Sequence, residues 1–533
     1  MDAKEKAGYM PEEESLGLSL LEKGQQGLAH VVFSRLGIIV LLLLLQLLLL
    51  FTAFYWLNAY LPHFIIVSTL FSGFMSMYLL NTDMDASAKI TWLLVIMLLP
   101  AVGAPLYCYT RSNMGKRMLK KKLQHLVEST RDSIPQNQEV LSRLKEANPG
   151  AAALARYMHR TGCFPVYDNT EVKYYPQGED KWRDLLQALE QAEHFIFLEY
   201  FIIDEGLMWG RVLEILAQKA KEGVDVRVMY DGTCEFSTLP HDYPKRLRAL
   251  GIQCKMFAPM TPFVSTHYNY RDHRKIAVID GHTAFTGGVN LADEYINRRP
   301  RFGHWKDTAI RLRGEAVPSF TLMFLQMWGV DEKNLEIDRF LAYPTCPPAE
   351  ARGFVLPYGD CPLDDDKVGE RVYMDMLNRA ENYVYIMSPY LILDGEMETA
   401  LKFAAERGVD VRLVLPGIPD KKTPWALAKT HYSSLLASGV KIYEYSPGFV
   451  HAKVFLADDK EAVVGTINLD YRSLYHHFEC AAFLYDTPCL TDIRSDMEET
   501  MAKSTLVEKN FMAQESLRVR LTGFLMKGLA PLL

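Results

Sequence analysis

The hydrophobic positions divide the chain into an apolar N-terminal part and a longer part in which helical and strand periodicities alternate. Leu36–Leu57 is an almost unbroken hydrocarbon run, and Phe64–Leu80 and Ile90–Tyr109 follow it. A helix of about 20 apolar residues crosses a bilayer. The pattern therefore predicts a transmembrane module of two to three helices over residues 36–110, because the middle run is shorter and carries Ser and Gly.

A cleaved signal peptide is the alternative for the first run, but its apolar region would be only about 7–15 residues long. A basic cluster follows the third run: Arg111, Lys116, Arg117, Lys120, Lys121 and Lys122. Positive charge at the end of a span favours the cytoplasmic side. The sequence thus predicts a multi-pass protein of the cell membrane with its catalytic part in the cytoplasm.

Two stretches of the remaining chain resemble each other, Leu185–Gly232 and Val372–Gly417. Each contains an amphipathic helix, an apolar strand, a loop, a second helix and a strand-like stretch after Gly-Val-Asp-Val-Arg. Alternating helix and strand patterns are typical of α/β sheets covered by helices. The repeat predicts two pseudo-symmetric α/β/α lobes.

The predicted organisation is a flexible tail over residues 1–35, the membrane module over 36–110, a first lobe over 111–345 and a second lobe over 346–533. The proline-rich stretch Tyr343–Lys367 is expected to be the linker between the lobes. Leu517–Lys527 is basic and apolar. That composition fits an interfacial segment or a packing helix of the second lobe equally well.

Charge and cysteine content narrow the function. The formal net charge is −7, which argues against a nucleic-acid binder because such proteins normally carry a basic surplus. The eight cysteines form no Cys-x-x-Cys pair and no group with zinc spacing, so we expect scattered, reduced thiols.

One polar motif occurs twice, as His-x-Lys-x4-Asp-x6-Gly-[Gly/Thr]-x-Asn. The first copy contains His273, Lys275, Asp280 and Asn290, and the second contains His451, Lys453, Asp458 and Asn468. In a strand, positions i and i+2 face the same way, so each His shares a face with its Lys. A single His-x-Lys string is common by chance, but a doubled pattern at equivalent places is not.

These residue types suit reaction at a phosphodiester without a metal or other cofactor. Lysines neutralise the non-bridging oxygens and asparagines donate hydrogen bonds to them. One neutral imidazole attacks phosphorus, and the other, protonated, gives its proton to the leaving alkoxide. The candidate catalytic residues are therefore His273, Lys275, Asp280, His451, Lys453 and Asp458, with Asn290 and Asn468 as phosphate-binding groups.

A carboxylate on the far nitrogen of each histidine would fix its tautomer. Asp307 follows the first motif and Glu479 follows the second, each at the start of a strand-like stretch. We expect these two to orient the histidines, so that each histidine has its own Lys, Asn and carboxylate.

Three features resemble the bacterial cardiolipin synthase branch of the phospholipase D superfamily. They are Asn269–Lys275 running on to Phe285–Asn290, Gly448–Lys453 running on to Gly465–Ser473, and the apolar module that ends at Leu98–Tyr107. The resemblance extends from about Leu36 to the C-terminus. Gly288 departs from it, since the wider superfamily often has Ser there.

The resemblance implies transfer of a phosphatidyl group between two phosphatidylglycerol molecules, which gives cardiolipin and glycerol through a phosphohistidine. It also implies that His273 is the nucleophile, that His451 is the acid and base, and that the partners are phosphatidylglycerol and anionic membrane lipids. The alternatives are a lipid hydrolase, a phosphatidyltransferase with another alcohol acceptor, a nuclease and a membrane scaffold without activity. The sequence leaves the oligomeric state open.

Overall fold

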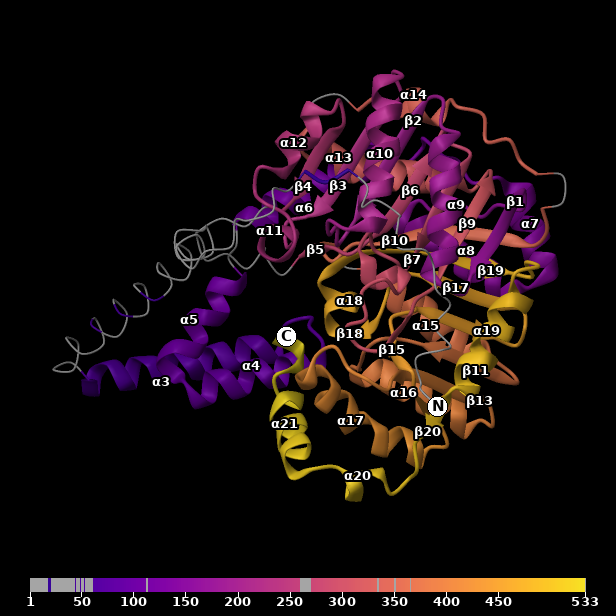
Figure 1. Ribbon diagram of the computed structural model, residues 1–533. Coiled ribbons are helices and arrows are strands. Elements are labelled where there is room, and N and C mark those ends of the chain that lie inside the picture. The colour runs from indigo at the N-terminus through magenta and orange to yellow at the C-terminus, as the bar shows by residue number, and fades with distance from the viewer. Residues whose placement is uncertain are drawn as a thin grey trace, which may run out of the picture.

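The computed structural model describes residues 18–20, 44, 48, 52, 61–111, 114–258, 270–332, 335–348, 351–364 and 366–532. The α/β part forms two lobes, and the N-terminal helices extend to one side of them (Figure 1). The two lobes confirm the α/β fold that the internal repeat predicts.

The first lobe is built on a seven-stranded mixed sheet of order β1-β9-β7-β6-β2-β3-β4. Its apolar strands are buried on both faces, which explains their continuous hydrophobic runs. The strands are β1 (Thr170–Tyr175), β2 (Phe195–Tyr200), β3 (Asp225–Asp231), β4 (Gln253–Phe257), β6 (Lys275–Ile279), β7 (Thr283–Gly287) and β9 (Ala309–Gly314). The helices α9 (Gly178–Glu190), α10 (Leu207–Lys221) and α12 (Tyr243–Ala249) pack on one face of this sheet.

The second lobe repeats this order as β10-β19-β17-β16-β11-β13-β14 and adds β20 (Ser504–Leu506) at the edge. The strands are β10 (Phe354–Asp360), β11 (Tyr383–Met387), β13 (Asp410–Pro416), β14 (Lys441–Tyr445), β16 (Val454–Ala457), β17 (Glu461–Gly465) and β19 (His477–Tyr485). The helices α15 (Val368–Arg379), α16 (Gly395–Glu406) and α17 (Lys422–Ala437) cover its outer face.

The inner faces of the two sheets share one hydrophobic core, to which α13 (Val317–Trp328) and α19 (Leu490–Ala502) also contribute. Two short strand pairs connect the lobes directly. β5 (Arg271–Asp272) pairs with β19, and β8 (His304–Lys306) pairs with β15 (Gly448–Val450). Each pair joins the strand before one histidine motif to the opposite lobe.

The predicted boundary between the lobes needs two corrections. The proposed linker Tyr343–Lys367 contains β10, which pairs with β19 along its whole length. Its run of buried apolar residues forms an edge strand, the place in a sheet where a proline such as Pro357 is tolerated. The helices α7 (Gln138–Ala147) and α8 (Pro149–Gly162), which we predicted in the first lobe, pack into the core of the second.

The N-terminal apolar region forms α3 (Leu61–Leu80), α4 (Ala86–Leu98) and α5 (Pro100–Arg111). The run Ile90–Tyr109 is thus divided between two helices rather than forming one, since α4 ends at Leu98 and α5 begins at Pro100. Among the described residues, no helix is both long and apolar enough to cross a bilayer. The run Leu36–Leu57 lies outside the described residues apart from positions 44, 48 and 52.

The structure also describes part of the N-terminal tail and the basic, apolar segment near the C-terminus. The predicted tail 1–35 is described only at 18–20, where the Leu20 amide donates to Glu205 in the first lobe (2.9 Å). The C-terminal helix α21 (Leu517–Lys527) packs on α17, with Gly523 against the Ala426 backbone. The packing interpretation of this segment is confirmed, and the interfacial one remains a prediction.

Candidate active site

The two histidine motifs meet where the lobes exchange short strands. The His273 amide donates to the Phe478 carbonyl (2.9 Å), and the His451 amide donates to the Lys306 carbonyl (2.7 Å). Each histidine backbone is therefore held by the other lobe. These bonds place the His273 ring beside Glu479, which follows Phe478, and the His451 ring beside Asp307, which follows Lys306.

The His273 ring pairs with Glu479. Nδ1 of His273 lies 2.9 Å from each carboxylate oxygen, and both side chains are buried. Thr466 and Ser473 also donate their hydroxyls to this carboxylate. Burial opposes ionisation of Glu479, but the neighbouring donors His273 and His477 outweigh it and hold its pKa below the usual range. Burial lowers the pKa of His273 well below its ordinary value.

The His451 ring pairs with Asp307 in the same manner. Its Nδ1 lies 2.6 Å from Asp307, which also accepts from the Thr308 amide (2.8 Å). Burial, followed by the charge of Lys453, lowers the pKa of His451 to about 4. Both imidazoles are thus neutral near pH 7 in the free protein, with Nδ1 committed to a carboxylate. Nε2 is left for chemistry in each ring.

The histidine–carboxylate pairing is crossed between the lobes. We expected Asp307 and Glu479 to orient the histidines, and the structure places both carboxylates there. However, Asp307, which follows the first motif, pairs with His451 of the second motif, and Glu479, which follows the second motif, pairs with His273 of the first. The expectation that each half supplies its own carboxylate is wrong, because the β5–β19 and β8–β15 pairs swap the partners.

Gly288 has a structural reason to lack a side chain. A Cβ atom there would lie 2.0 Å from Oδ1 of Asp307 and 2.9 Å from the His451 carbonyl oxygen. The equivalent position of the second motif is Thr466, whose hydroxyl donates to Glu479. The two halves therefore differ in how they support their carboxylates.

The two lysines are buried beside the histidines. Nζ of Lys275 donates to the His273 carbonyl (2.5 Å), and Nζ of Lys453 donates to the His451 carbonyl. Burial lowers the pKa of Lys275 to about 8 and that of Lys453 to about 7. Charge on Lys275 also lowers the pKa of both Lys453 and His451, since all these groups line one site.

The two motif asparagines are also buried but are not equally available. Oδ1 of Asn290 accepts from the Ile202 amide (3.0 Å), and its Nδ2 donates to the Tyr295 hydroxyl (2.7 Å). Nδ2 of Asn468 has only a long contact with Asp470 (3.4 Å), and its Oδ1 has no partner among the described residues. Asn468 is thus free to donate to a ligand, whereas Asn290 is engaged in positioning a loop.

Asp280 and Asp458 do not belong to the reactive group. Each lies at the end of β6 or β16 that is farther from its histidine. Asp280 accepts from the amides of residues 193–195, and Asp458 accepts from those of residues 381–383, at 2.7–2.8 Å. Our grouping of these aspartates with the catalytic residues is corrected: they fix the start of the neighbouring strands β2 and β11.

Aromatic side chains surround the histidines, and sequence reasoning missed them. The Phe201 ring stands edge-on to His273 with centroids 4.9 Å apart. Tyr295 and Trp305 each lie 5.4 Å from His451. In the sequence, these aromatic residues are marked only by their position directly after a strand or beside a motif. Many residues that serve only packing have the same kind of position, so the signal is too weak to identify them.

One cluster at the site has metal-binding residue types. The ligand atoms of His273, His477 and Glu479 lie within 4.8 Å of one another. Glu479 already accepts from His273, Thr466 and Ser473, so its oxygens are committed to hydrogen bonds. The expectation of chemistry without a metal remains a prediction.

Known proteins resemble the chain in both sequence and fold. A family profile described as "Cardiolipin synthase, PLD-like domain" matches residues 185–300 and 373–501, and each match contains one motif. An uncharacterised Streptococcus mutans protein is 57% identical over 86% of this chain and 99% of its own. The cardiolipin synthase of Alkalihalophilus pseudofirmus is 34% identical over 88% of this chain and 93% of its own.

Among solved structures, phosphatidylserine synthase of Haemophilus influenzae superposes with a TM-score of 0.54 at 12% identity. The match covers 68% of this chain and 95% of that protein. At this identity the likeness concerns the fold alone, and it supports the two-lobed architecture.

Proposed function

Because the chain belongs to the cardiolipin synthase family of phospholipase D-like phosphatidyltransferases, we propose that it joins two phosphatidylglycerol molecules through a phosphohistidine. The observation that carries this proposal is the crossed pair of dyads, His273–Glu479 and His451–Asp307, with a buried lysine beside each. Two neutral imidazoles with equivalent support suit a double displacement, in which one attacks and the other moves a proton.

In the first half-reaction, Nε2 of His273 bonds to phosphorus while the bond from phosphorus to the headgroup oxygen breaks. His451 gives a proton to that oxygen, and glycerol leaves. The phosphodiester charge raises the pKa of His451 in the complex, because a nearby anion favours the imidazolium. Lys275 and Lys453 stabilise the charge on the five-coordinate transition state.

In the second half-reaction, the terminal hydroxyl of another phosphatidylglycerol gives its proton to His451. Its oxygen bonds to phosphorus while the phosphorus–nitrogen bond to His273 breaks. Cardiolipin leaves, and both histidines return to their starting states. Glu479 and Asp307 hold Nδ1–H of each ring throughout, which keeps Nε2 in the reacting position.

The surroundings of the two rings support His273 as the nucleophile. The Phe201 ring covers one side of His273, and Glu479 is held by additional hydroxyl donors. Such a site keeps the imidazole neutral and its carboxylate ionised. At His451, Asp307 accepts from the Thr308 amide, and Lys453 lies 2.9 Å from Nδ1 of the ring.

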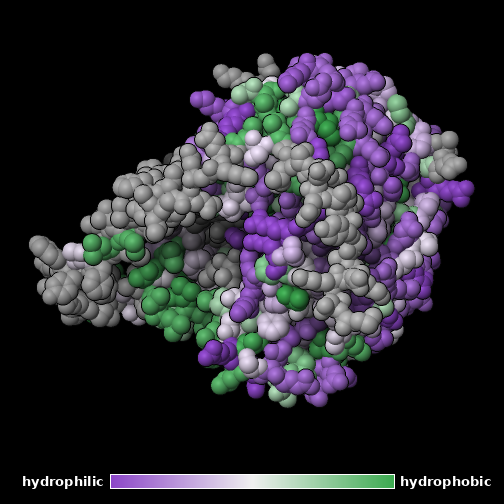
Figure 2. Space-filling view, in the orientation of Figure 1, coloured by the Kyte–Doolittle hydropathy of each residue, from purple (hydrophilic) through white to green (hydrophobic). Residues whose placement is uncertain are grey.

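We place the lobes at the cytoplasmic surface of the cell membrane as part of this proposal. Apolar side chains are exposed along α3, α4 and α5, for example Leu70 at 70%, and on α21, where Phe524 is 75% exposed. Hydrophobic residues gather over these N-terminal helices in Figure 2. The hydroxyl of Thr91 in α4 donates to the Gly528 carbonyl just after α21 (2.9 Å), so both apolar surfaces lie together. Such an exposed apolar surface suits contact with lipid.

A defined reaction tests the proposal. Purified full-length protein is incubated with phosphatidylglycerol vesicles, and cardiolipin, glycerol and phosphatidic acid are measured. The proposal requires cardiolipin, with glycerol released in an amount equal to cardiolipin plus phosphatidic acid. Phosphatidic acid without cardiolipin would instead assign a lipid hydrolase.

A further inference from the structure

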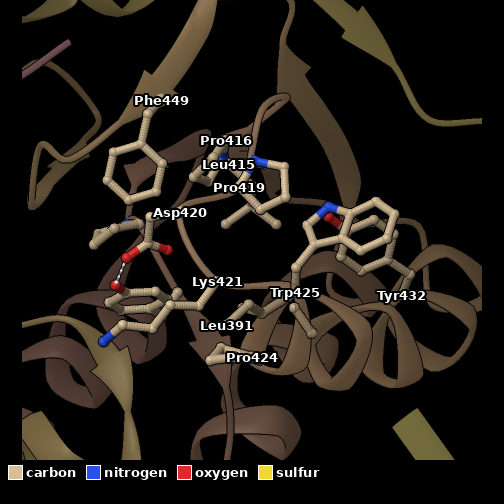
Figure 3. Close-up of a pocket in the computed structure, with 13 residues that line it drawn as sticks. Leu391, Leu415, Pro416, Pro419, Asp420, Lys421, Pro424, Trp425, Tyr432 and Phe449 are labelled. Carbon is tan, nitrogen blue, oxygen red and sulfur yellow. Dashed lines mark hydrogen bonds between the residues drawn. The ribbon is translucent and has the colours of Figure 1, made fainter. Parts of the chain in front are cut away.

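A pocket opens beside the second histidine motif (Figure 3). It encloses about 320 Å³ of empty space, including the part open to solvent. Its walls come from the ends of β11 and β13, from the loop into α17 and from β15. The lining includes Tyr390, Asp420, Lys421, Trp425 and Phe449.

The pocket is built on the same backbone segments as the reactive groups. The ring of Phe449 lines it and lies 5.9 Å from the His451 ring. The amide of Ile418, in the pocket loop, donates to the Gly448 carbonyl (3.1 Å), in the strand that leads to His451. On the other side, Leu391 pairs with Leu469, the residue after Asn468. The pocket therefore adjoins both His451 and the free amide of Asn468.

Polar groups stand out among these apolar walls. The Tyr390 hydroxyl donates to Asp420 (2.6 Å), as the dashed line in Figure 3 shows. Lys421 follows at the exposed rim. Nε1 of Trp425 is buried, and no described residue accepts its hydrogen. A carboxylate, a hydroxyl, an ammonium and an unused N–H donor together suit a ligand with several hydroxyls.

The stereochemistry of the proposed reaction decides which ligand belongs there. In an in-line displacement at phosphorus, the leaving oxygen lies opposite the attacking atom. With His273 attacking, the alcohol leaves and later enters on the His451 side, where this pocket opens. We propose that the pocket binds the headgroup glycerol of phosphatidylglycerol, first as the leaving alcohol and then as the acceptor, and so favours it over water. This inference rests on the proposed function.

The first lobe has Ile202 at the position that Tyr390 occupies in the second lobe. Ile203 pairs with Leu291 there, as Leu391 pairs with Leu469 in the second lobe. The residues just before each pair are Phe201 and Ile202 in the first lobe, and Pro389 and Tyr390 in the second. At this position the two lobes therefore differ, since the second lobe has a tyrosine hydroxyl and the first has an isoleucine.

The variants Tyr390→Phe, Asp420→Asn and Trp425→Phe test the inference in the full-length protein. Tyr390→Phe and Asp420→Asn remove the hydroxyl and the negative charge with little change of shape, and Trp425→Phe removes the N–H donor but leaves a smaller ring. The matched control is Tyr383→Phe, which breaks another tyrosine–aspartate bond, to Asp459 (2.7 Å), at the opposite end of β11.

The measured quantity is the ratio of cardiolipin to phosphatidic acid formed from phosphatidylglycerol vesicles. Both products come from the same phosphohistidine, so the ratio reports only its partition between the lipid alcohol and water. We expect the ratio to fall about tenfold in each pocket variant, the usual effect of one lost hydrogen bond. The control should keep the wild-type ratio.

Free alcohols give a second readout. Wild-type protein should transfer the phosphatidyl group to glycerol far better than to 1-propanol, and Asp420→Asn should lose most of that preference. A wild-type ratio and preference in all folded pocket variants would overturn the inference alone. If wild-type protein forms no cardiolipin, the proposed function itself fails.

Discussion

Nδ1 of His273 lies 2.9 Å from the carboxylate of Glu479, although 206 residues separate them in the chain. The reciprocal pair, His451 and Asp307, is 2.6 Å apart and crosses the lobes in the opposite direction. Neither lobe alone contains a supported histidine. The reactive group is therefore assembled only when the two lobes dock.

Glu479→Gln should lower kcat by about 10³-fold, because a neutral amide neither fixes the tautomer nor balances charge on the ring. The rate of cardiolipin formation at saturating phosphatidylglycerol measures this. Glu398→Gln is the matched control, since Glu398 accepts from His431 (2.8 Å) away from the site. Equal losses of kcat in the two variants would mean that Glu479 affects the reaction only by stabilising the folded protein.

Gly288→Ser should abolish most activity, because its Cβ would displace the Asp307 carboxylate that supports His451. We expect a loss of at least about 10²-fold in kcat/KM, as for other displacements of catalytic groups. Gly395→Ser is the control, since nothing lies within 4 Å of a Cβ at that position. Full activity in Gly288→Ser would show that Asp307 does not need its present position.

Binding of a phosphodiester should be accompanied by proton uptake at pH 8. The pKa values of Lys275 and Lys453 lie at about 8 and about 7 in the free protein. An anion raises both values, so a fraction deprotonated at pH 8 must take up protons. At pH 6 both lysines are already charged, and their uptake disappears.

Calorimetry of a non-titrating phosphodiester in buffers of different ionisation enthalpy measures this uptake. Lys453→Arg should reduce it, because a guanidinium stays charged throughout this range. Proton release at pH 8, or an uptake at pH 8 that Lys453→Arg does not reduce, would contradict the lysine assignment.

Asp280→Asn should lower stability without changing turnover per folded molecule. Asp280 has a φ of 51° and accepts three backbone amides at the start of β2. Asn tolerates this backbone conformation, so strain does not change. The free energy of unfolding should fall by about 1–3 kcal/mol, because an amide oxygen accepts the backbone hydrogen bonds less strongly than a carboxylate. Chemical denaturation measures it, and activity is normalised to the amount of trapped phosphoenzyme. A large fall in normalised turnover would restore a catalytic role for Asp280.

The repeat at Leu185–Gly232 and Val372–Gly417 was enough to predict two α/β lobes, since each unit carries its own helix and strand periods. The paired motifs also identified His273 and His451. The crossing of Glu479 and Asp307 was not predictable, because it depends on two strand pairs that are only two or three residues long. Such short strands have no periodicity to detect.

The aspartates show the opposite limit. Asp280 and Asp458 recur with the histidines in the sequence pattern, yet they lie at the far ends of β6 and β16 and bind backbone amides. A residue can therefore recur in both copies of a motif because it supports the same backbone structure, and not only because it takes part in the chemistry. The pocket at Tyr390 and Asp420 was equally hidden, because its residues come from separate loops.

Trapping of the covalent intermediate identifies the histidine that attacks phosphorus. Labelled phosphatidylglycerol is mixed with the protein, the reaction is quenched in alkali, where phosphohistidine survives, and the labelled peptide is identified by mass spectrometry. We expect a phosphatidyl adduct on His273, and none in His273→Ala. An adduct on His451, or cardiolipin formed by His273→Ala at a substantial rate, would contradict it.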